Sequence, residues 1–484
     1  WLKNAPPVGN ISVVNELLPN IDVTYTQATQ GCTEAFIQHQ KSKSDSDLPV
    51  KVQLGDVKLN KKEKLKLNTL LHKYQDVFST DKDDAGLTDT VEHRIYTEDE
   101  VPITQRDRRI PPKLKPEVQK IIQQWLKQGI IEESDSSWAS QIVIVEKKGG
   151  GLRLCTDYRL LNKKTKRDAY PLPRIEEALD ALQGAKIFSC LDMTQGYLQM
   201  KVHPEDRHKT AFRCLGKLYH FNRLPYGLCN GPSSFMRLMT KCFGDIDLED
   251  IVIYLDDIMA FSRDVPGMLD KLEMVFRRCR AHGLKLNPSK CILFADHAKY
   301  LGHIVSSDGI GTDPNKTEAI RKYNVPENRR QLMQFLGLVG YYRKFIRGFS
   351  KIAAPLTDLL SSDGKIKKSS NARISIKEKW TSDCDAAFQQ LKEKLCEAPI
   401  LGYPDFSKPF ILETDSCIQG MGAVLSQKQN GKDPVVIAFA SRALRKHESS
   451  MKCYSSEKLE FLALHWKKFR EYLLYNECQV YSDN

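Results

Sequence analysis

Apolar residues recur along this chain with two different periods, one typical of helices and one typical of strands. A repeat of three to four residues predicts helices at 67–78, 115–128, 233–242, 269–282 and 455–472. Short apolar or β-branched runs predict strands at 141–145, 152–154, 187–192, 198–202, 251–254, 410–414, 421–426, 435–440 and 479–481. Because helices and strands are mixed along the chain, the pattern predicts an α+β fold.

Two polar stretches divide the chain. The run 41–47 is typical of a linker, and 361–379 is rich in Ser, Lys and Gly, which predicts a tether. Asp313 followed by Pro314 is a good helix start, because the Asp side chain caps free N–H groups and Pro suits the first helical position. The next helix has an apolar face formed by Leu332, Phe335, Leu336, Val339, Tyr342 and Phe345.

These signals give an expected domain organisation. We predict an N-terminal segment and linker at 1–64, to which we assign no function, and a large α+β part at 65–312. A small helical subdomain at 313–360, the tether at 361–379 and a C-terminal domain at 380–484 follow.

Composition narrows the class of protein. The net charge of +12 favours a polyanionic partner such as nucleic acid, although an evenly solvated basic surface has the same charge. No apolar run approaches the roughly 20 residues that span a bilayer, so we expect a soluble protein without a membrane partner. The 13 cysteines form no C-x-x-C pair, which argues against a zinc site or a disulfide framework and favours a reduced, intracellular setting. Residue 1 is Trp and no signal-peptide pattern follows, so we expect a piece of a longer chain.

The sharpest candidate chemistry is a pair of acids between two apolar runs. Asp256 and Asp257 follow Tyr254-Leu255 and lie between 251–253 and 258–261. Polar residues favour turns, so the pair alone also fits an ordinary hairpin. A third acid, Asp192, ends another apolar strand. Three such carboxylates would be costly to bury unless they bind metal, and a pair of Mg²⁺ ions is what nucleotidyl transfer requires.

The chain resembles the reverse transcriptases of gypsy-type LTR retrotransposons. The matching motifs, in family order over about 65–484, are Leu-Arg-Leu-Cys-Thr-Asp-Tyr-Arg (152–159), Tyr-Pro-Leu-Pro (170–173), Leu-Asp-Met-Thr-Gln-Gly-Tyr-Leu-Gln (191–199), Leu-Pro-Tyr-Gly-Leu (224–228), Tyr-Leu-Asp-Asp (254–257), Tyr-Leu-Gly-His (300–303), Phe-Leu-Gly-Leu (335–338), Tyr-Tyr-Arg-Lys-Phe (341–345) and Glu-Thr-Asp-Ser (413–416). The resemblance implies a right-hand polymerase whose fingers and palm occupy 65–312 and whose thumb occupies 313–360. A truncated RNase H-like α/β domain would follow the tether.

The same resemblance implies roles for individual residues. Asp192, Asp256 and Asp257 would be the catalytic, metal-binding triad. Arg153 and one of Lys147 or Lys148 would grip the incoming triphosphate, and the glycine-rich loop leaves open which lysine does so. A cationic hairpin tip suits that task, because arginine meets two phosphate oxygens at once.

Two further positions would shape the nucleotide pocket. Tyr197 matches the family's steric gate against the ribose 2′-hydroxyl, although a core aromatic is the alternative. Tyr226 and Gly227 match a segment near the nascent base pair, where the family usually has Phe in place of Tyr226.

In the C-terminal domain, Asp415, Glu460 and Asp483 resemble three of four RNase H carboxylates, and Glu457 competes with Glu460. Glu460 is preferred because Glu-Phe-Leu-Ala-Leu (460–464) matches the family in register. The helix after Trp466 is about one turn shorter than is common, and the chain ends before the fourth acid. We therefore expect RNase H activity to be lost or incomplete in this chain.

The sequence thus predicts an RNA- and DNA-templated DNA polymerase. Its expected cofactor is Mg²⁺, two ions with Mn²⁺ as a substitute, and its expected partners are an RNA template, DNA primer-template, RNA–DNA hybrid and dNTPs. We expect it in the cytoplasm, within virus-like particles. The alternative is a decayed or domesticated nucleic-acid-binding protein, which the intact Asp192, Asp256 and Asp257 disfavour. A non-LTR reverse transcriptase is disfavoured by the tether and the RNase H-like segment.

Overall fold

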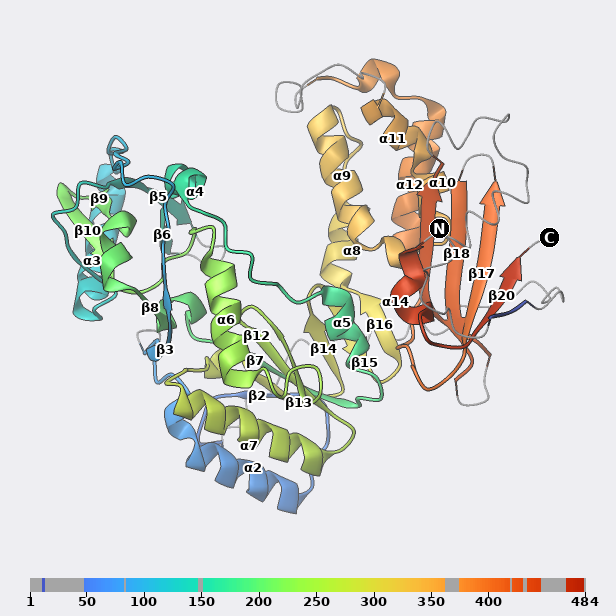
Figure 1. The fold of residues 1–484 in the computed structure, drawn as a ribbon, viewed down its shortest axis with the longest axis horizontal. Coiled ribbons are helices and arrows are strands. Elements are labelled where there is room, and N and C mark those ends of the chain that lie inside the picture. The colour runs from blue at the N-terminus through green and yellow to red at the C-terminus, as the bar shows by residue number, and fades with distance from the viewer. Residues whose placement is uncertain are drawn as a thin grey trace, which may run out of the picture. The chain divides into compact units, whose positions relative to one another are not determined.

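The computed structural model describes residues 11–13, 48–81, 84–146, 151–361, 374–417, 420–429, 433–444 and 467–482 (Figure 1). The chain divides into two compact units, one formed by 42–298 and the other by 1–41 with 299–484. Among the described residues, no helix is long and apolar enough to cross a membrane.

The centre of the first unit is a five-stranded sheet in the order β11-β12-β7-β13-β2. Its strands are β11 (Ile251–Tyr254), β12 (Asp257–Ser262), β7 (Ile187–Asp192), β13 (Ile292–Ala295) and β2 (Gln53–Leu54). The apolar side chains of these short runs pack with three helices, α2 (Lys61–Lys73), α6 (Gly231–Phe243) and α7 (Val265–Ala281). Asp264 caps α7 by accepting a 2.8 Å hydrogen bond from the Gly267 backbone N–H. This sheet is the palm that the sequence resemblance implies.

A second sheet in this unit has the order β4-β10-β9-β5-β6, and we call it the fingers sheet. Its strands are β4 (Ile131–Glu133), β10 (Lys217–Phe221), β9 (Phe212–Cys214), β5 (Ser140–Glu146) and β6 (Leu152–Thr156). Helix α3 (Lys115–Lys127) packs Val118 and Ile122 on this sheet, and the core around them includes Phe212. A two-stranded sheet, β3 (Thr88–His93) with β8 (Met200–Val202), completes the unit's strands among the described residues.

The second unit begins with the antiparallel hairpin of β15 (His303–Ser306) and β16 (Gly309–Thr312), which pairs with β14 (His297–Tyr300). Five helices follow: α8 (Pro314–Arg321), α9 (Arg329–Tyr341), α10 (Phe349–Ile352), α11 (Ala354–Ser361) and α12 (Ser382–Cys396). Asp313 caps α8 as predicted, accepting from the Asn315 N–H at 3.0 Å. Helix α12 packs on the other four helices, and the rings of Phe335 and Phe388 lie 4.5 Å apart.

The remaining sheet of the second unit has the order β1-β20-β17-β18-β19. Its strands are β1 (Ile11–Val13), β20 (Cys478–Ser482), β17 (Phe410–Cys417), β18 (Gly420–Gln427) and β19 (Val435–Ala443). β17 pairs with β20 in parallel and with β18 in antiparallel orientation, and β1 pairs with β20 in parallel. The short segments η9 (Lys467–Phe469) and α14 (Arg470–Leu473) contribute Phe469 to the core over this sheet.

The α+β prediction is confirmed, and most predicted elements are present with shifted ends. The predicted strand 198–202 is wrong at its start, because residues 196–199 form the 3₁₀ turn η4 (Gly196–Gln199), and only Met200–Val202 is extended. Most of the predicted helix 455–472 lies outside the described residues, as does 362–373 of the tether. Helix α12 was not predicted. The domain boundaries stay a prediction.

Candidate polymerase active site

Three carboxylates meet at one end of the palm sheet because of strand register. Asp192 is the last residue of β7, Asp257 is the first residue of β12, and the two are direct partners across the antiparallel pair. Tyr254 pairs with Asp257, so Leu255 and Asp256 form a two-residue turn between β11 and β12. The sequence places each acid at a strand end, and the pairing brings the three ends together.

The turn that carries Asp256 has an unusual backbone. Leu255 has φ +57°, a left-handed conformation that costs a non-glycine residue about 1–2 kcal/mol and that tight two-residue hairpins require. Its backbone N–H lies 3.2 Å from the Met236 Sδ of α6. Gly196 approaches from another side, since a Cβ built there would lie 3.4 Å from the Asp256 Cβ. The turn that carries Asp256 is therefore in contact with Met236 and packed closely against Gly196.

Electrostatics at this sheet end fit a cation. Burial, together with the negative charges of Asp256 and Asp192, raises the pKa of Asp257. Burial also raises the pKa of Asp192, opposed by a hydrogen bond from Lys290. Burial and like charge thus disfavour the charged forms of both groups, and carboxylate oxygens are the ligands that Mg²⁺ prefers. This donor set fits a divalent metal ion.

Lys290 was missed by the sequence analysis. Its Nζ lies 3.1 Å from both carboxylate oxygens of Asp192, and it ends the short turn η6 (Pro288–Lys290). The turn is fixed to the palm, because the Asn287 N–H donates to the Asp192 carbonyl oxygen at 2.8 Å. Asn287-Pro288 is a recognisable turn start, but nothing local in the sequence links it to an acid almost a hundred positions away.

An aromatic cluster lies beside the acids. The Tyr197 ring is 5.2 Å from the Tyr226 ring and 5.1 Å from the Phe235 ring, measured between centroids. Burial and the negative charge of Asp256 raise the pKa of Tyr197 to about 12. The Arg153 guanidinium carbon lies 6.0 Å from the Tyr226 ring centroid, which joins the fingers sheet to this cluster. The fold thus brings Tyr197, Tyr226 and Arg153 close to the three carboxylates.

Gly227 needs to be glycine for a conformational reason. Its φ is +102°, and a Cβ there would lie 3.5 Å from the Thr156 carbonyl oxygen at the end of β6. Its own carbonyl oxygen accepts a 2.8 Å hydrogen bond from the Asn162 Nδ2 of α4 (Arg159–Lys164). The loop after Leu224 is therefore seated on the fingers sheet.

The pair of Asp157 and Arg159 was also missed. Arg159 donates to both Asp157 carboxylate oxygens at 2.8 and 2.6 Å, and Gln141 donates to the same carboxylate at 3.1 Å. Hydrogen bonds from Arg159 hold the pKa of Asp157 well below its usual range. The Arg159 side chain remains 80% exposed. Both residues lie in the motif 152–159, so the sequence signal for this pair was the motif itself.

Several predicted site residues lie outside the described residues. These are Lys147, Lys148, Glu460, Asp483 and the competing Glu457. Asp415 is described and exposed on β17, one position after Thr414, which pairs with Ser482 of β20. The RNase H-like site therefore stays a prediction.

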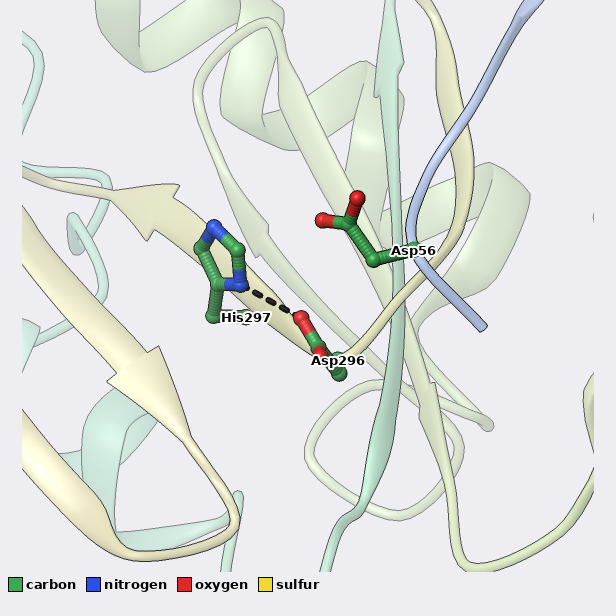
Figure 2. Close-up of side chains that lie close together, drawn as sticks. All are labelled: Asp56, Asp296 and His297. Carbon is green, nitrogen blue, oxygen red and sulfur yellow. Dashed lines mark hydrogen bonds and ion pairs between the residues drawn. The ribbon is translucent and has the colours of Figure 1, made fainter. Parts of the chain in front are cut away.

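A second group of possible metal ligands lies elsewhere in the first unit. Within the described ranges, Asp56, Asp296 and His297 are the group whose ligand atoms all lie within 4.8 Å of one another (Figure 2). The His297 Nδ1 lies 2.5 Å from the Asp296 Oδ1, and both aspartates are exposed. None of these residues belongs to the triad.

Comparisons with known proteins agree with this geometry. Residues 145–305 match the family "Reverse transcriptase (RNA-dependent DNA polymerase)", and residues 380–480 match "RNase H-like domain found in reverse transcriptase". The chain is 34% identical over 461 residues to the retrovirus-related Pol polyprotein from transposon 412 of Drosophila melanogaster, covering 93% of this chain and 36% of that protein. It is 35% identical over 418 residues to the Pol polyprotein from transposon gypsy of the same fly, covering 84% of this chain and 39% of that protein. The chain thus spans well under half of these relatives.

Solved structures show the same fold. A foamy viral protease-reverse transcriptase in complex with double-stranded DNA has a TM-score of 0.77 at 24% identity, covering 94% of this chain and 89% of that chain. The same foamy viral protein in complex with an RNA/DNA hybrid has a TM-score of 0.73, covering 94% and 58%.

Proposed function

Because this chain belongs to the reverse transcriptase family found in the Pol polyproteins of LTR retrotransposons, we propose that it copies RNA and DNA templates into DNA. The observation that carries the proposal is the register that places Asp192 opposite Asp257 with Asp256 in the adjoining turn. Reverse transcriptases use divalent metal ions, and this arrangement gathers three carboxylates where such ions would bind.

In the proposed reaction, Asp192, Asp256 and Asp257 would hold two ions, which we propose are Mg²⁺ with Mn²⁺ as a substitute. Such a pair activates a primer 3′-hydroxyl and neutralises charge on the departing pyrophosphate. The pKa values of Asp192 and Asp257, raised by burial and by the neighbouring acids, support this proposal, because a bound cation would favour the charged form of both groups. The ion pair from Lys290 to Asp192 would have to rearrange when a metal binds.

The nucleotide would lie between the fingers sheet and the palm. Arg153 would contact the triphosphate, and so would one of Lys147 or Lys148. Tyr197 would lie under the sugar, with Tyr226 and Gly227 shaping the base-pair pocket. The contact of the Arg153 guanidinium with the Tyr226 ring supports this arrangement, because the proposed triphosphate contact and the proposed base-pair pocket would then be neighbours.

The proposed partners follow from the same chemistry. They are an RNA template, a DNA primer-template, an RNA–DNA hybrid and dNTPs, and the net charge of +12 supports polyanionic partners. For the RNase H-like domain we propose Asp415, Glu460 and Asp483 as acidic residues of its site. The compartment we propose is the cytoplasm, within virus-like particles.

Primer extension tests the proposed polymerase. The purified chain, a labelled DNA primer on a defined RNA template and all four dNTPs should yield full-length DNA with Mg²⁺ and no extension with EDTA. Asp257→Asn is the inactive variant, and Asp296→Asn, which changes an exposed acid outside the triad, is the matched control and should extend normally. No extension by the folded chain with Mg²⁺ or Mn²⁺ would refute the proposal.

A further inference from the structure

A group of metal-ligating side chains lies outside the polymerase site, at the edge of the palm sheet where β2 pairs with β13. It consists of Asp56, Asp296 and His297, which surround one point and whose ligand atoms all lie within 4.8 Å of one another (Figure 2). We propose that these three side chains bind one Zn²⁺ ion, which fastens the segment after β2 to the end of β13. This inference goes beyond the proposed polymerase function and does not depend on it.

The main chain on both sides of Asp56 is fixed to β13. The backbone N–H groups of Gly55 and Val57 donate to carbonyl oxygens of that strand at 2.7 and 3.1 Å. A Cβ on Gly55 would lie 2.4 Å from the Ala295 Cα, so a larger residue would force the two segments apart. Because the backbone that carries Asp56 is already held in place, less conformational entropy is lost when its side chain binds a metal.

Asp296 and His297 are consecutive residues whose side chains nevertheless meet. In a regular strand such neighbours point to opposite faces of the sheet. The extended chain is interrupted here, since β13 ends at Ala295 and β14 begins at His297. Phe294 has φ +58°, a left-handed conformation that is unusual for an aromatic residue and that breaks the regular backbone just before the pair. The interruption lets the His297 Nδ1 lie 2.5 Å from the Asp296 Oδ1.

The donor set suits zinc better than magnesium. Carboxylate and imidazole groups are both ligands of zinc, whereas magnesium prefers oxygen ligands. With a neutral imidazole, the two carboxylates balance the charge of Zn²⁺. Ligands of one tetrahedral zinc ion lie roughly 3.3 Å apart, given metal–ligand distances of about 2.0–2.2 Å. Small side-chain rotations would therefore bring the three ligand atoms into place, with water as the fourth ligand.

The two carboxylates of this group have no lysine or arginine to neutralise them. Within the part of the chain that the structure describes, neither Asp56 nor Asp296 forms an ion pair with a lysine or arginine, and the partner of Asp296 is His297. Both aspartates are exposed, so water screens their repulsion only in part at this short separation. A divalent cation between them would turn the repulsion into attraction.

A zinc ion at this position would strengthen a short edge pairing of the palm sheet. β2 contributes only two residues and lies at the end of the strand order, next to β13. The ion would join positions 56 and 296, and links between positions far apart in the sequence restrict the unfolded chain most. We expect a gain in stability and no part in nucleotide transfer. Because imidazole is not a preferred magnesium ligand, primer extension in Mg²⁺, including the Asp296→Asn control above, does not load this site.

Zinc titration and melting curves of the full chain test the site. Both are measured in Mg²⁺, so that the proposed polymerase site is already occupied when Zn²⁺ is added. Wild type should bind one zinc equivalent that His297→Ala and Asp56→Asn do not bind. Zinc at roughly 100 times its Kd should raise the melting temperature of wild type by about 4–8 °C and that of either variant by less than about 1 °C.

Matched controls remove the same side-chain types elsewhere in the first unit. His72→Ala on α2 and Asp270→Asn on α7 change exposed residues and should keep both the zinc equivalent and the melting shift. Melting curves without zinc check that each variant is folded. Co²⁺ in place of Zn²⁺ reports the ligand type, because cysteine thiolates give an intense charge-transfer band that carboxylate and imidazole ligands do not give.

Zinc binding that is unchanged in His297→Ala and Asp56→Asn, a wild-type chain that zinc does not stabilise, or a Co²⁺ spectrum dominated by thiolate would overturn the inference. A failure of the wild-type chain to extend any primer would instead count against the polymerase proposal alone, because zinc binding does not need synthesis.

Discussion

Replacing Tyr197 by Val should let the enzyme incorporate ribonucleotides. The ring lies against Tyr226 and Phe235, and a Cβ on Gly196 would contact both Phe235 and Asp256, so Tyr197 follows directly on a residue packed against the triad. In the proposed nucleotide pocket, this ring would exclude a 2′-hydroxyl. Valine would open that space without changing any of the proposed metal ligands.

The expected effect of Tyr197→Val has two parts, a loss of nucleotide selectivity and a loss of stability. Relief of the clash should reduce discrimination against ribonucleotides by about 1–3 kcal/mol, or roughly 5- to 150-fold. The ring is also partly buried against the palm core, and two aromatic contacts are worth about 0.5–1.5 kcal/mol each. We therefore expect a stability loss of about 1–3 kcal/mol, below the cost of about 3–5 kcal/mol for deleting a fully buried ring.

Single-nucleotide incorporation measures the change in selectivity, and a melting curve measures the change in stability. kcat/KM for a dNTP and its ribonucleotide counterpart should be determined for wild type, Tyr197→Val and Tyr197→Phe. The Phe variant keeps the ring and removes the hydroxyl, so its selectivity should stay near wild type. If the Val variant melts earlier but has an unchanged selectivity ratio, the ring is a core aromatic and the gate reasoning is refuted.

Three further predictions follow from described residues. Asp256→Asn should lower primer extension by several orders of magnitude while duplex affinity, measured by anisotropy, stays within about threefold; near-normal extension by the folded variant would remove Asp256 from the site. The logarithm of the binding constant for primer-template should fall linearly with the logarithm of the salt concentration, because each neutralised duplex phosphate contributes a slope of about −0.9. A flat response from low to moderate salt would show that the basic excess is not the contact surface. Burial lowers the pKa of His93 to about 4, so the unfolded chain takes up a proton between about pH 6.5 and 4 that the folded chain does not, and stability should fall over that range by at most about 3 kcal/mol. Urea unfolding of wild type and His93→Gln measures this, and an equally steep pH dependence in the variant would contradict it.

Much of the active site could be predicted from the sequence because its signals are local. Asp192, Asp256 and Asp257 each end or begin an apolar run, and a strand that ends in an acid presents it at a sheet edge whatever its neighbours are. The helix start at Asp313-Pro314 is likewise local, since capping involves only the first turn. The sequence by itself therefore determined these strand ends, this helix start and the candidate acids.

The tertiary structure decided which of these local features meet. Register made Asp257 the partner of Asp192, and a two-residue turn set Asp256 beside them. Lys290 reaches Asp192 only because β13 pairs with β7. The Gln105 side chain donates to the Asp157 carbonyl oxygen only because its backbone pairs with Ala139, just before β5. The residues of such pairs are far apart in the sequence, and no hydrophobic period or helix cap indicates that they meet. Their contact energy comes from the packing of the whole chain, which a local sequence pattern does not encode.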